Sequence, residues 1–155
     1  MIQKHLIRCN EGNEMKRYII NEIQSDGYER FAIIEEIGQS IKINVHFFEY
    51  DEYLENGEQS RKKKKGDVLE GNLSIELVTF SQRVEEELYY NQNIQSSPHI
   101  NAIIEVTEII DEYSLYAFSS ILNDNIVIEF ESAIDYKVGE HVFVTGSLEL
   151  REIED

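Results

Sequence analysis

The chain has 155 residues, and 31 acidic residues against 14 Lys and Arg give it a formal net charge of −17 at pH 7. Hydrophobic residues make up 41% of the chain and proline occurs once, a balance that excludes a disordered tail or a collagen-like fibre. The longest apolar runs are three or four residues, whereas a membrane-spanning helix needs roughly 20. We therefore expect a single-domain cytoplasmic protein without a membrane partner.

The negative charge is concentrated in the second half of the chain. Residues 1–80 contain 11 basic and 15 acidic side chains, whereas residues 81–155 contain 3 basic and 16 acidic ones. Affinity for nucleic acid depends on Lys and Arg side chains that neutralise phosphates. The sequence therefore predicts that direct nucleic-acid binding is unlikely, except weakly through one basic run: Arg61, Lys62, Lys63, Lys64 and Lys65.

The first predicted element runs from Glu14 to Ile23. Its apolar residues lie near helical spacing, which favours a short helix. The part from Tyr18 onward also fits a strand that enters the turn-forming residues Ser25, Asp26 and Gly27.

Alternation of apolar and polar residues dominates the rest of the chain and predicts strands with one buried face. It covers residues 41–48 and 69–77 in the first half, and 102–106, 115–119, 126–130 and 142–150 in the second. Residues that favour tight reversals lie between these segments, at positions 25–27, 38–40, 111–112 and 123–125. We therefore expect mostly antiparallel strands.

A second helix is predicted from Ser81 to Tyr90. Ser81 is a suitable N-cap, three glutamates follow in the early turns, and Val84 and Leu88 are four residues apart. The next stretch, residues 91–98, is polar and contains the single proline. It predicts a connection between two parts of the fold.

These elements predict a mainly β fold: an antiparallel barrel or sandwich built from two β-rich halves with one or two short helices. We expect a single domain over residues 1–155. Its sub-structures would be an N-terminal β half at 1–80, a helix and connection at 81–97, and a C-terminal β half at 98–155.

Two segments of the chain echo each other. Residues 64–77 and 137–150 both begin Lys-x-Gly-acid and both end Ser-x-Glu-Leu, at a separation of 73. Upstream, residues 31–35 resemble residues 101–105, and residues 41–43 resemble residues 126–128. The echoes predict two related halves, each with a glycine turn that leads into a long strand. A glycine within such a strand, such as Gly146, lets another backbone come close or lets the strand bend.

The segment from Tyr136 to Leu150 resembles the closing part of small β-barrels of the oligonucleotide/oligosaccharide-binding (OB) type. The resemblance extends over about 50 residues at the C-terminus and concerns the fold. It implies an OB-like C-terminal half and brings no functional residues with it.

Residues that usually carry chemistry are scattered. The four histidines, His5, His46, His99 and His141, occur singly, without the spacing of a zinc site. The lone Cys9 excludes an internal disulfide and a thiolate metal site. The acidic clusters lack the pattern of a calcium loop, and neither a P-loop nor a GxSxG motif is present. We expect a protein that is not an enzyme, with no catalytic residues, no metal and no cofactor.

One predicted surface of the C-terminal half combines carboxylates with aromatic rings. Its members lie at outward positions of the predicted strands: Glu105, Tyr116, Phe118, Glu129, Glu131, Phe143 and Glu149. Exposed aromatic rings among charges are typical of protein contact surfaces, so we predict partner binding there. The alternative is that the N-terminal half covers the three aromatic rings and leaves only the acids in water.

The overall profile, which is small, acidic, mainly β and without a chemical motif, is similar to that of acidic bacterial immunity proteins. The similarity implies a non-catalytic protein that inhibits or neutralises a basic protein partner, for example a nuclease toxin. Opposite charge on the two proteins would speed their association. The alternative function is a β-barrel assembly or binding module of a larger complex.

Overall fold

The computed structural model describes residues 16–50 and 62–152, and within them every regular element is a strand. The nine strands are β1 (Lys16–Asp26), β2 (Glu29–Glu36), β3 (Lys42–Phe48), β4 (Val68–Val84), β5 (Tyr89–Asn91), β6 (His99–Asp111), β7 (Ser114–Ser119), β8 (Asp124–Phe130) and β9 (His141–Glu152). They form one mixed sheet in the order β1-β2-β3-β9-β4-β8-β7-β6-β5. The mainly β prediction is confirmed.

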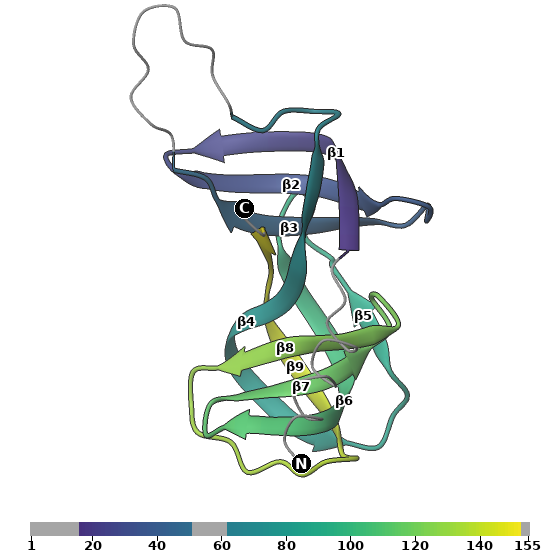
Figure 1. Ribbon diagram of the computed structural model, residues 1–155. Helices are drawn as coiled ribbons and strands as arrows, with labels where there is room; N and C mark the ends of the chain where they lie inside the picture. The colour runs from purple at the N-terminus through teal and green to yellow at the C-terminus, as the bar shows by residue number, and fades with distance from the viewer. Residues whose placement is uncertain (1–15, 51–61, 153–155) are drawn as a thin grey trace, which may run out of the picture.

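The sheet closes on itself through two additional pairings, β1 with β4 and β9 with β6. These pairings create two circuits of five strands that share β4 and β9. We call β1, β2, β3, β9 and β4 ring 1, and β6, β7, β8, β4 and β9 ring 2. Figure 1 shows the other strands of ring 1 at one end of the molecule and those of ring 2 at the other, with β4 and β9 running between them.

Each half of the chain is a Greek key. Three hairpin-connected strands are followed by a fourth that returns to lie beside the first, which gives the spatial orders β4-β1-β2-β3 and β9-β6-β7-β8. Each fourth strand is long enough to continue into the other half, where it closes the ring by parallel pairing, β9 with β3 and β4 with β8. The sheet is therefore mixed, and the expectation of mostly antiparallel pairing holds for the other pairs.

The two rings are related by an approximate two-fold axis between β4 and β9. Residues 73 positions apart in these strands are equivalent, and the antiparallel ladder pairs Ile75 directly with its equivalent Leu148. On either side the pairs exchange partners, as a two-fold axis requires: Ser74 with Glu149, and Glu76 with Ser147. The echo between residues 64–77 and 137–150 thus corresponds to equivalent places in the fold.

The turns before β4 and β9 repeat in detail. Gly66 N–H donates to the carbonyl of Ile20 at 2.9 Å, and Gly139 N–H donates to that of Val106 at 2.8 Å. The two glycines have φ of 93° and 95°, in the left-handed region that glycine adopts at no steric cost. Each turn also has an acidic side chain that accepts from the backbone N–H of the lysine three residues earlier, at 2.9 Å.

The outer strands repeat with a different offset. Ile34 pairs with Ile43 in ring 1, and the corresponding pair in ring 2 is Ala117 with Ile126, 83 positions later. The upstream echoes of the sequence therefore matched the wrong residues. Residues 31–35 belong to β2 and residues 101–105 to β6, which is the equivalent of β1, and the match of residues 41–43 with 126–128 is displaced by two positions.

Neither predicted helix forms within the described residues. The segment from Lys16 to Ile23 lies in β1, and residues 14 and 15 lie outside the described part. A bulge between Ile20 and Glu22 adds one residue to the strand. Successive inward side chains are therefore three residues apart at this point, a spacing that resembles that of a helix.

The second predicted helix, Ser81–Tyr90, is replaced by the end of β4 and by β5. Residues 81–84 pair with residues 141–144 of β9, so tertiary pairing overrides the local capping pattern. None of the described residues belongs to a helix long and apolar enough to cross a membrane.

Residues 92–98 of the predicted connection are irregular and join β5 to β6, and they contact strands of both rings. The Gln92 side chain donates to the carbonyl of Asn44 at 2.7 Å and accepts from its N–H at 2.9 Å. The carbonyl of Pro98 accepts from Leu148 N–H at 2.9 Å. The connection thus supplies hydrogen bonds to β3 and β9, which share a single register pair, His46 with Glu149.

Buried apolar side chains of both rings form one core cluster. Gly146 lies in β9 where β4 crosses it, and a Cβ atom there would be 2.6 Å from the carbonyl oxygen of Glu76. The prediction that this glycine permits close approach of another backbone is confirmed.

Candidate functional site

The residues of the predicted partner-binding surface lie in separate places. Glu105 and Phe118 are cross-strand neighbours on β6 and β7, and Phe143 lies nearby on β9, in ring contact with Phe80 at 6.1 Å. Tyr116 lies further along β7, opposite Val127 of β8. The first three therefore belong to one side of ring 2.

The other three predicted residues lie where the rings meet. Glu149 of β9 and Glu129 of β8 belong to two different polar clusters, described below, and Glu131 is exposed just after β8. The Glu149 side chain is 12% exposed. Because its carboxylate is already engaged within the fold, it has little surface to offer a partner.

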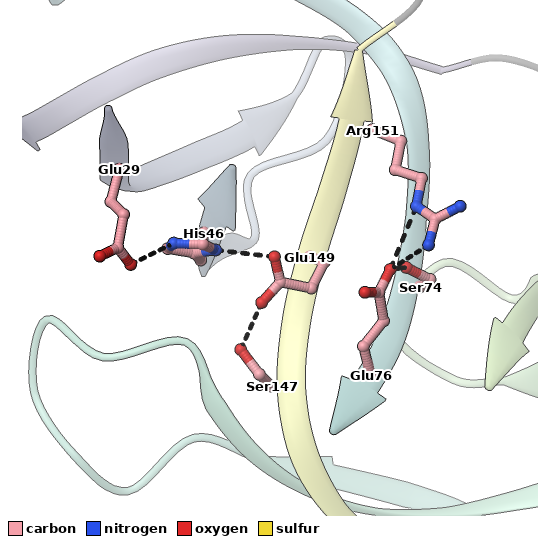
Figure 2. Close-up of polar contacts among 7 residues, drawn as sticks. All are labelled: Glu29, His46, Ser74, Glu76, Ser147, Glu149 and Arg151. Carbon is pink, nitrogen blue, oxygen red and sulfur yellow. Dashed lines mark hydrogen bonds and ion pairs between the residues drawn. The ribbon is translucent and has the colours of Figure 1, made fainter. Parts of the chain in front are cut away.

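The cluster of ring 1 is centred on His46, which is buried on the outer side of β3. Its Nδ1 lies 2.7 Å from Glu149 Oε1, and its Nε2 lies 2.8 Å from Glu29 Oε1. Ser147 donates to the other oxygen of Glu149 at 2.7 Å. Figure 2 shows the imidazole held between the two carboxylates.

The His46 pKa is set by opposing effects. Burial lowers it, because a charged imidazolium loses its water, while the hydrogen bonds and charges of Glu149 and then of Glu29 raise it. The two carboxylates prevail, and the pKa of His46 lies above its usual 6.5. The protonated ring donates to both carboxylates and so joins β2, β3 and β9.

The cluster of ring 2 has related geometry and a different cation. Ser74 donates to Glu76 at 2.7 Å, as Ser147 does to Glu149, and Arg151 lies 2.8 Å from Glu76 and 3.1 Å from Glu129. Figure 2 shows this arginine–glutamate–serine group on β4 and β9, beside the His46 group. In both clusters a cation is held between carboxylates by contacts within the fold.

A row of aromatic rings extends outward from His46, and sequence reasoning missed it. The His46 ring is 5.0 Å from that of Phe31 and 4.9 Å from that of Phe48. Phe48 in turn faces Tyr50 at 6.1 Å, and Tyr50 contacts Tyr28 at 5.0 Å. Tyr28, Phe48 and Tyr50 are 52%, 54% and 69% exposed. We call these three residues the aromatic surface.

Buried Arg30 holds the aromatic surface in place. Its side chain has no solvent exposure, and its Nε contacts Glu49 Oε1 at 3.0 Å. Its Nη1 donates to the carbonyls of Gly27 and Glu29 at 2.9 and 3.0 Å. The guanidinium therefore links two parts of the chain. One is the β1–β2 turn, which contains Tyr28, and the other is Glu49, which directly precedes Tyr50.

The surroundings of the aromatic surface contain both signs of charge. Glu29 lies opposite Phe48 in the β2–β3 register, and its side chain is 46% exposed. The described part of the basic run begins nearby, because Lys63 N–H donates to the Glu49 carboxylate at 3.0 Å. Lys63 Nζ pairs with Glu152 at 3.0 Å, and Lys64 Nζ lies 3.7 Å from Asp67. Arg61, like Cys9 and His5, lies outside the described residues.

Metal and small-ligand chemistry have less support. The described residues contain no group of three or more His, Cys, Asp or Glu arranged to hold a metal ion. A pocket of about 270 Å³ lies between ring 1 and residues 120–123. Lys16 at its wall is already paired with Glu36 and Asp124, at 3.9 and 3.7 Å, so it offers no free charge to a ligand. The aromatic surface is the stronger candidate.

Comparison with family models, with curated proteins and with solved structures gives no match to this chain. We therefore infer function from the geometry and charge of the molecule.

Proposed function

We propose that this protein is a non-catalytic, acidic binding protein that engages a basic protein partner through the aromatic surface of ring 1. The observation that carries the proposal is the exposure of three contacting aromatic rings beside a half-exposed carboxylate, Glu29, on a chain of net charge −17. Aromatic residues are enriched at the centres of protein interfaces, where they supply most of the binding energy.

The long-range field supports the same partner. Acidic residues outnumber basic ones most strongly in residues 81–155, and this region includes the distinctive strands of ring 2. Such a field raises the rate of encounter with a basic protein by about 10- to 1,000-fold. Ring 2 would thus attract the partner, and ring 1 would hold it.

An inhibitor of the immunity type is the form of this function that we favour. A rigid acidic protein that covers the basic active site of a nuclease toxin, in the cytoplasm of the producing cell, would need no catalytic residue of its own. The OB-type resemblance is supported by the five strands and the Greek-key order of each ring. Such folds present binding surfaces on rigid strands, which suits this purpose.

The alternative function is an assembly module of a larger complex. Exposed Phe80 and its half-buried ring neighbour Phe143 on ring 2 favour it, because a second apolar surface would allow two partners at once. The two functions differ in salt dependence: an inhibitor relies on electrostatic attraction, whereas an assembly contact of apolar rings does not.

The test is capture of the partner from source-cell lysate, followed by affinity measurements with the purified pair. We expect one stoichiometric basic protein, whose association slows as salt rises. Replacing Phe48 and Tyr50 with alanine should weaken binding at least 30-fold, the effect of losing about 2 kcal/mol at an interface hot spot. The matched control is Tyr113→Ala, which removes a 50% exposed ring from ring 2 and should change affinity less than twofold.

Two results would contradict the proposal. Capture of a salt-resistant set of several proteins would favour the assembly module. Equal loss of affinity in the Tyr113→Ala control would show that the aromatic surface of ring 1 is not the contact.

A further inference from the structure

We infer that the aromatic surface of ring 1 recognises an arginine side chain of its partner, which stacks on Phe48 and Tyr50 and pairs with Glu29. The inference rests on the proposed function and names the chemistry of that same site. Three observations support it: the orientation of the Phe48 and Tyr50 rings, the position of the Glu29 carboxylate, and an arginine of this chain, Arg83, that lies over a tyrosine ring.

Two of the three rings are stacked on each other. Phe48 and Tyr50 have 6.1 Å between their centroids and 6° between their planes, and Tyr28 is tilted by 56° against Tyr50. Because all three residues are more than half exposed, ring surface remains accessible to a planar ligand. A guanidinium is planar and weakly hydrated, so it stacks on an aromatic face, whereas the ammonium of lysine is compact and strongly hydrated. The geometry thus favours arginine over lysine.

The carboxylate lies at the edge of these rings. Glu29 is the cross-strand neighbour of Phe48, and His46 contacts one of its oxygens, Oε1. Within the described part of the chain no hydrogen bond or ion pair is recorded for the other oxygen, Oε2. A guanidinium above Phe48 has N–H groups directed outward in its own plane, where they can donate to that oxygen.

The same combination occurs within the chain. The guanidinium of Arg83 lies 5.0 Å from the centre of the Tyr136 ring. Its Nε donates to Glu140 at 2.9 Å, and its Nη2 donates to the backbone carbonyl of Asp135 at 2.8 Å. Ring 2 therefore contains, as an internal contact, an arginine that is stacked on an aromatic ring and paired with a carboxylate. Within residues 16–50 and 62–152, no arginine of this chain is stacked on the rings of the aromatic surface.

Single-stranded nucleic acid is the competing ligand, because bases also stack on exposed rings. The charges argue against it. In the described part of the basic run, Lys63 pairs with Glu152 and Lys64 with Asp67, and Glu29 would face the phosphates. An oligonucleotide therefore serves as one arm of the test.

The experiment compares three fluorescein-labelled probes on the full chain at 150 mM salt by fluorescence anisotropy. Two are peptides of equal length and charge, four Gly-Arg repeats and four Gly-Lys repeats, and the third is a ten-nucleotide oligo-dT. We expect the arginine peptide to bind about tenfold more tightly than the lysine peptide, the size of a cation–π contribution at a partly exposed site. We expect oligo-dT to bind most weakly.

Variants locate the preference. Replacing Phe48 and Tyr50 with leucine should abolish the difference between the two peptides, because apolar area remains but the ring faces are lost. Glu29→Gln should weaken the arginine peptide more than the lysine peptide. The matched control, Tyr113→Leu on ring 2, should leave the preference unchanged, and unfolding midpoints will confirm that each variant is folded.

Each contrary result has a distinct meaning. Equal affinity for the two peptides overturns the arginine inference and leaves the proposed basic partner standing. Absence of peptide binding also overturns it, and the purified partner then tests the proposed function separately. Tightest binding of oligo-dT overturns both, in favour of nucleic acid.

Discussion

Ring 1 and ring 2 share a strand order and carry opposite chemistry at equivalent positions. Both first strands have a bulge at the same place, between Ile20 and Glu22 in ring 1 and between Val106 and Glu108 in ring 2. On the outer side, however, three aromatic positions of ring 1 correspond to polar ones of ring 2, 83 residues later: Phe31 to Ser114, His46 to Glu129, and Phe48 to Glu131.

The fold therefore does not require aromatic side chains at the positions of Phe31 and Phe48. Ring 2 closes with polar residues at these positions, so packing alone does not account for exposed rings in ring 1. Inward positions behave differently, because both rings bury apolar side chains there. The exposed ring of Phe48 therefore supports the proposed contact with another molecule.

The largest expected effect concerns the residue that supports the aromatic surface. Arg30 is fully buried, whereas its equivalent in ring 2, Tyr113, is 50% exposed. Arg30→Ala removes the partner of Glu49 and leaves the carbonyls of Gly27 and Glu29 without their donor. We expect a loss of about 3 kcal/mol in the free energy of unfolding, the cost of breaking a buried charge network. Urea unfolding followed by circular dichroism measures it.

The control is Tyr113→Ala, which should cost less than about 0.5 kcal/mol as an exposed substitution. Equal losses in the two variants would show that Arg30 has no special structural role.

The strand pattern was predictable from sequence because alternation records burial directly. The inward residues of β3, β6, β7 and β8 are buried as their spacing predicts. Two features were out of reach. The bulge in β1 gives a strand the apolar spacing of a helix. The parallel pairings that join the halves leave no local signal in the sequence.

The site was less predictable than the fold. Alternation over residues 41–48 predicts that Phe47 points inward and Phe48 outward, but it cannot show that Phe48 and Tyr50 stay uncovered. Glu149 was assigned to a contact surface because its position points outward. Sequence could not reveal that His46, 103 residues away, lies against it.

The second-largest expected effect on stability concerns His46, the cation of the ring 1 cluster. At pH 5.5 the protonated His46 donates to Glu29 and Glu149, and His46→Gln should lower the free energy of unfolding by about 2 kcal/mol, as expected for hydrogen bonds to charged groups. Because the folded pKa is raised above 6.5, this stabilisation is complete below about pH 6.5 and declines as pH rises through the folded pKa. The difference between the two unfolding curves from pH 5.5 to 9 measures it.

A pH-independent difference would mean that His46 has the same pKa in the folded and unfolded chains, and a difference that changes in the opposite direction would mean that the ring is held neutral. The other histidines are common to both proteins, so they cancel from the comparison.

A smaller effect tests the equivalence of the two rings themselves. Gly66 and Gly139 have the same left-handed backbone, and a Cβ atom at either would meet nothing within 4 Å. Replacing either with alanine should therefore cost about 1 kcal/mol from the backbone conformation alone. Equal losses in thermal unfolding, which add in the double variant, would confirm that the turns are equivalent. A loss confined to one turn would show that the repeat is only geometrical.

The smallest effect on stability is expected at Arg151, which is the cation of the ring 2 cluster as His46 is of the ring 1 cluster. Its side chain is 62% exposed, and ion pairs in water contribute little because solvent screens them. Arg151→Gln should lower the free energy of unfolding by about 0.5 kcal/mol at low salt and by almost nothing at 0.5 M salt, where charges are screened within a few ångströms. Unlike the loss at His46, it should not change between pH 5.5 and 9, because arginine stays charged. A loss as large as that of His46→Gln would mean that both parallel junctions depend on their cations. The small loss that we expect would show that backbone pairing stabilises the parallel junction of ring 2, in which residues 74–78 of β4 pair with residues 127–130 of β8. The parallel junction of ring 1 has one register pair and relies on His46.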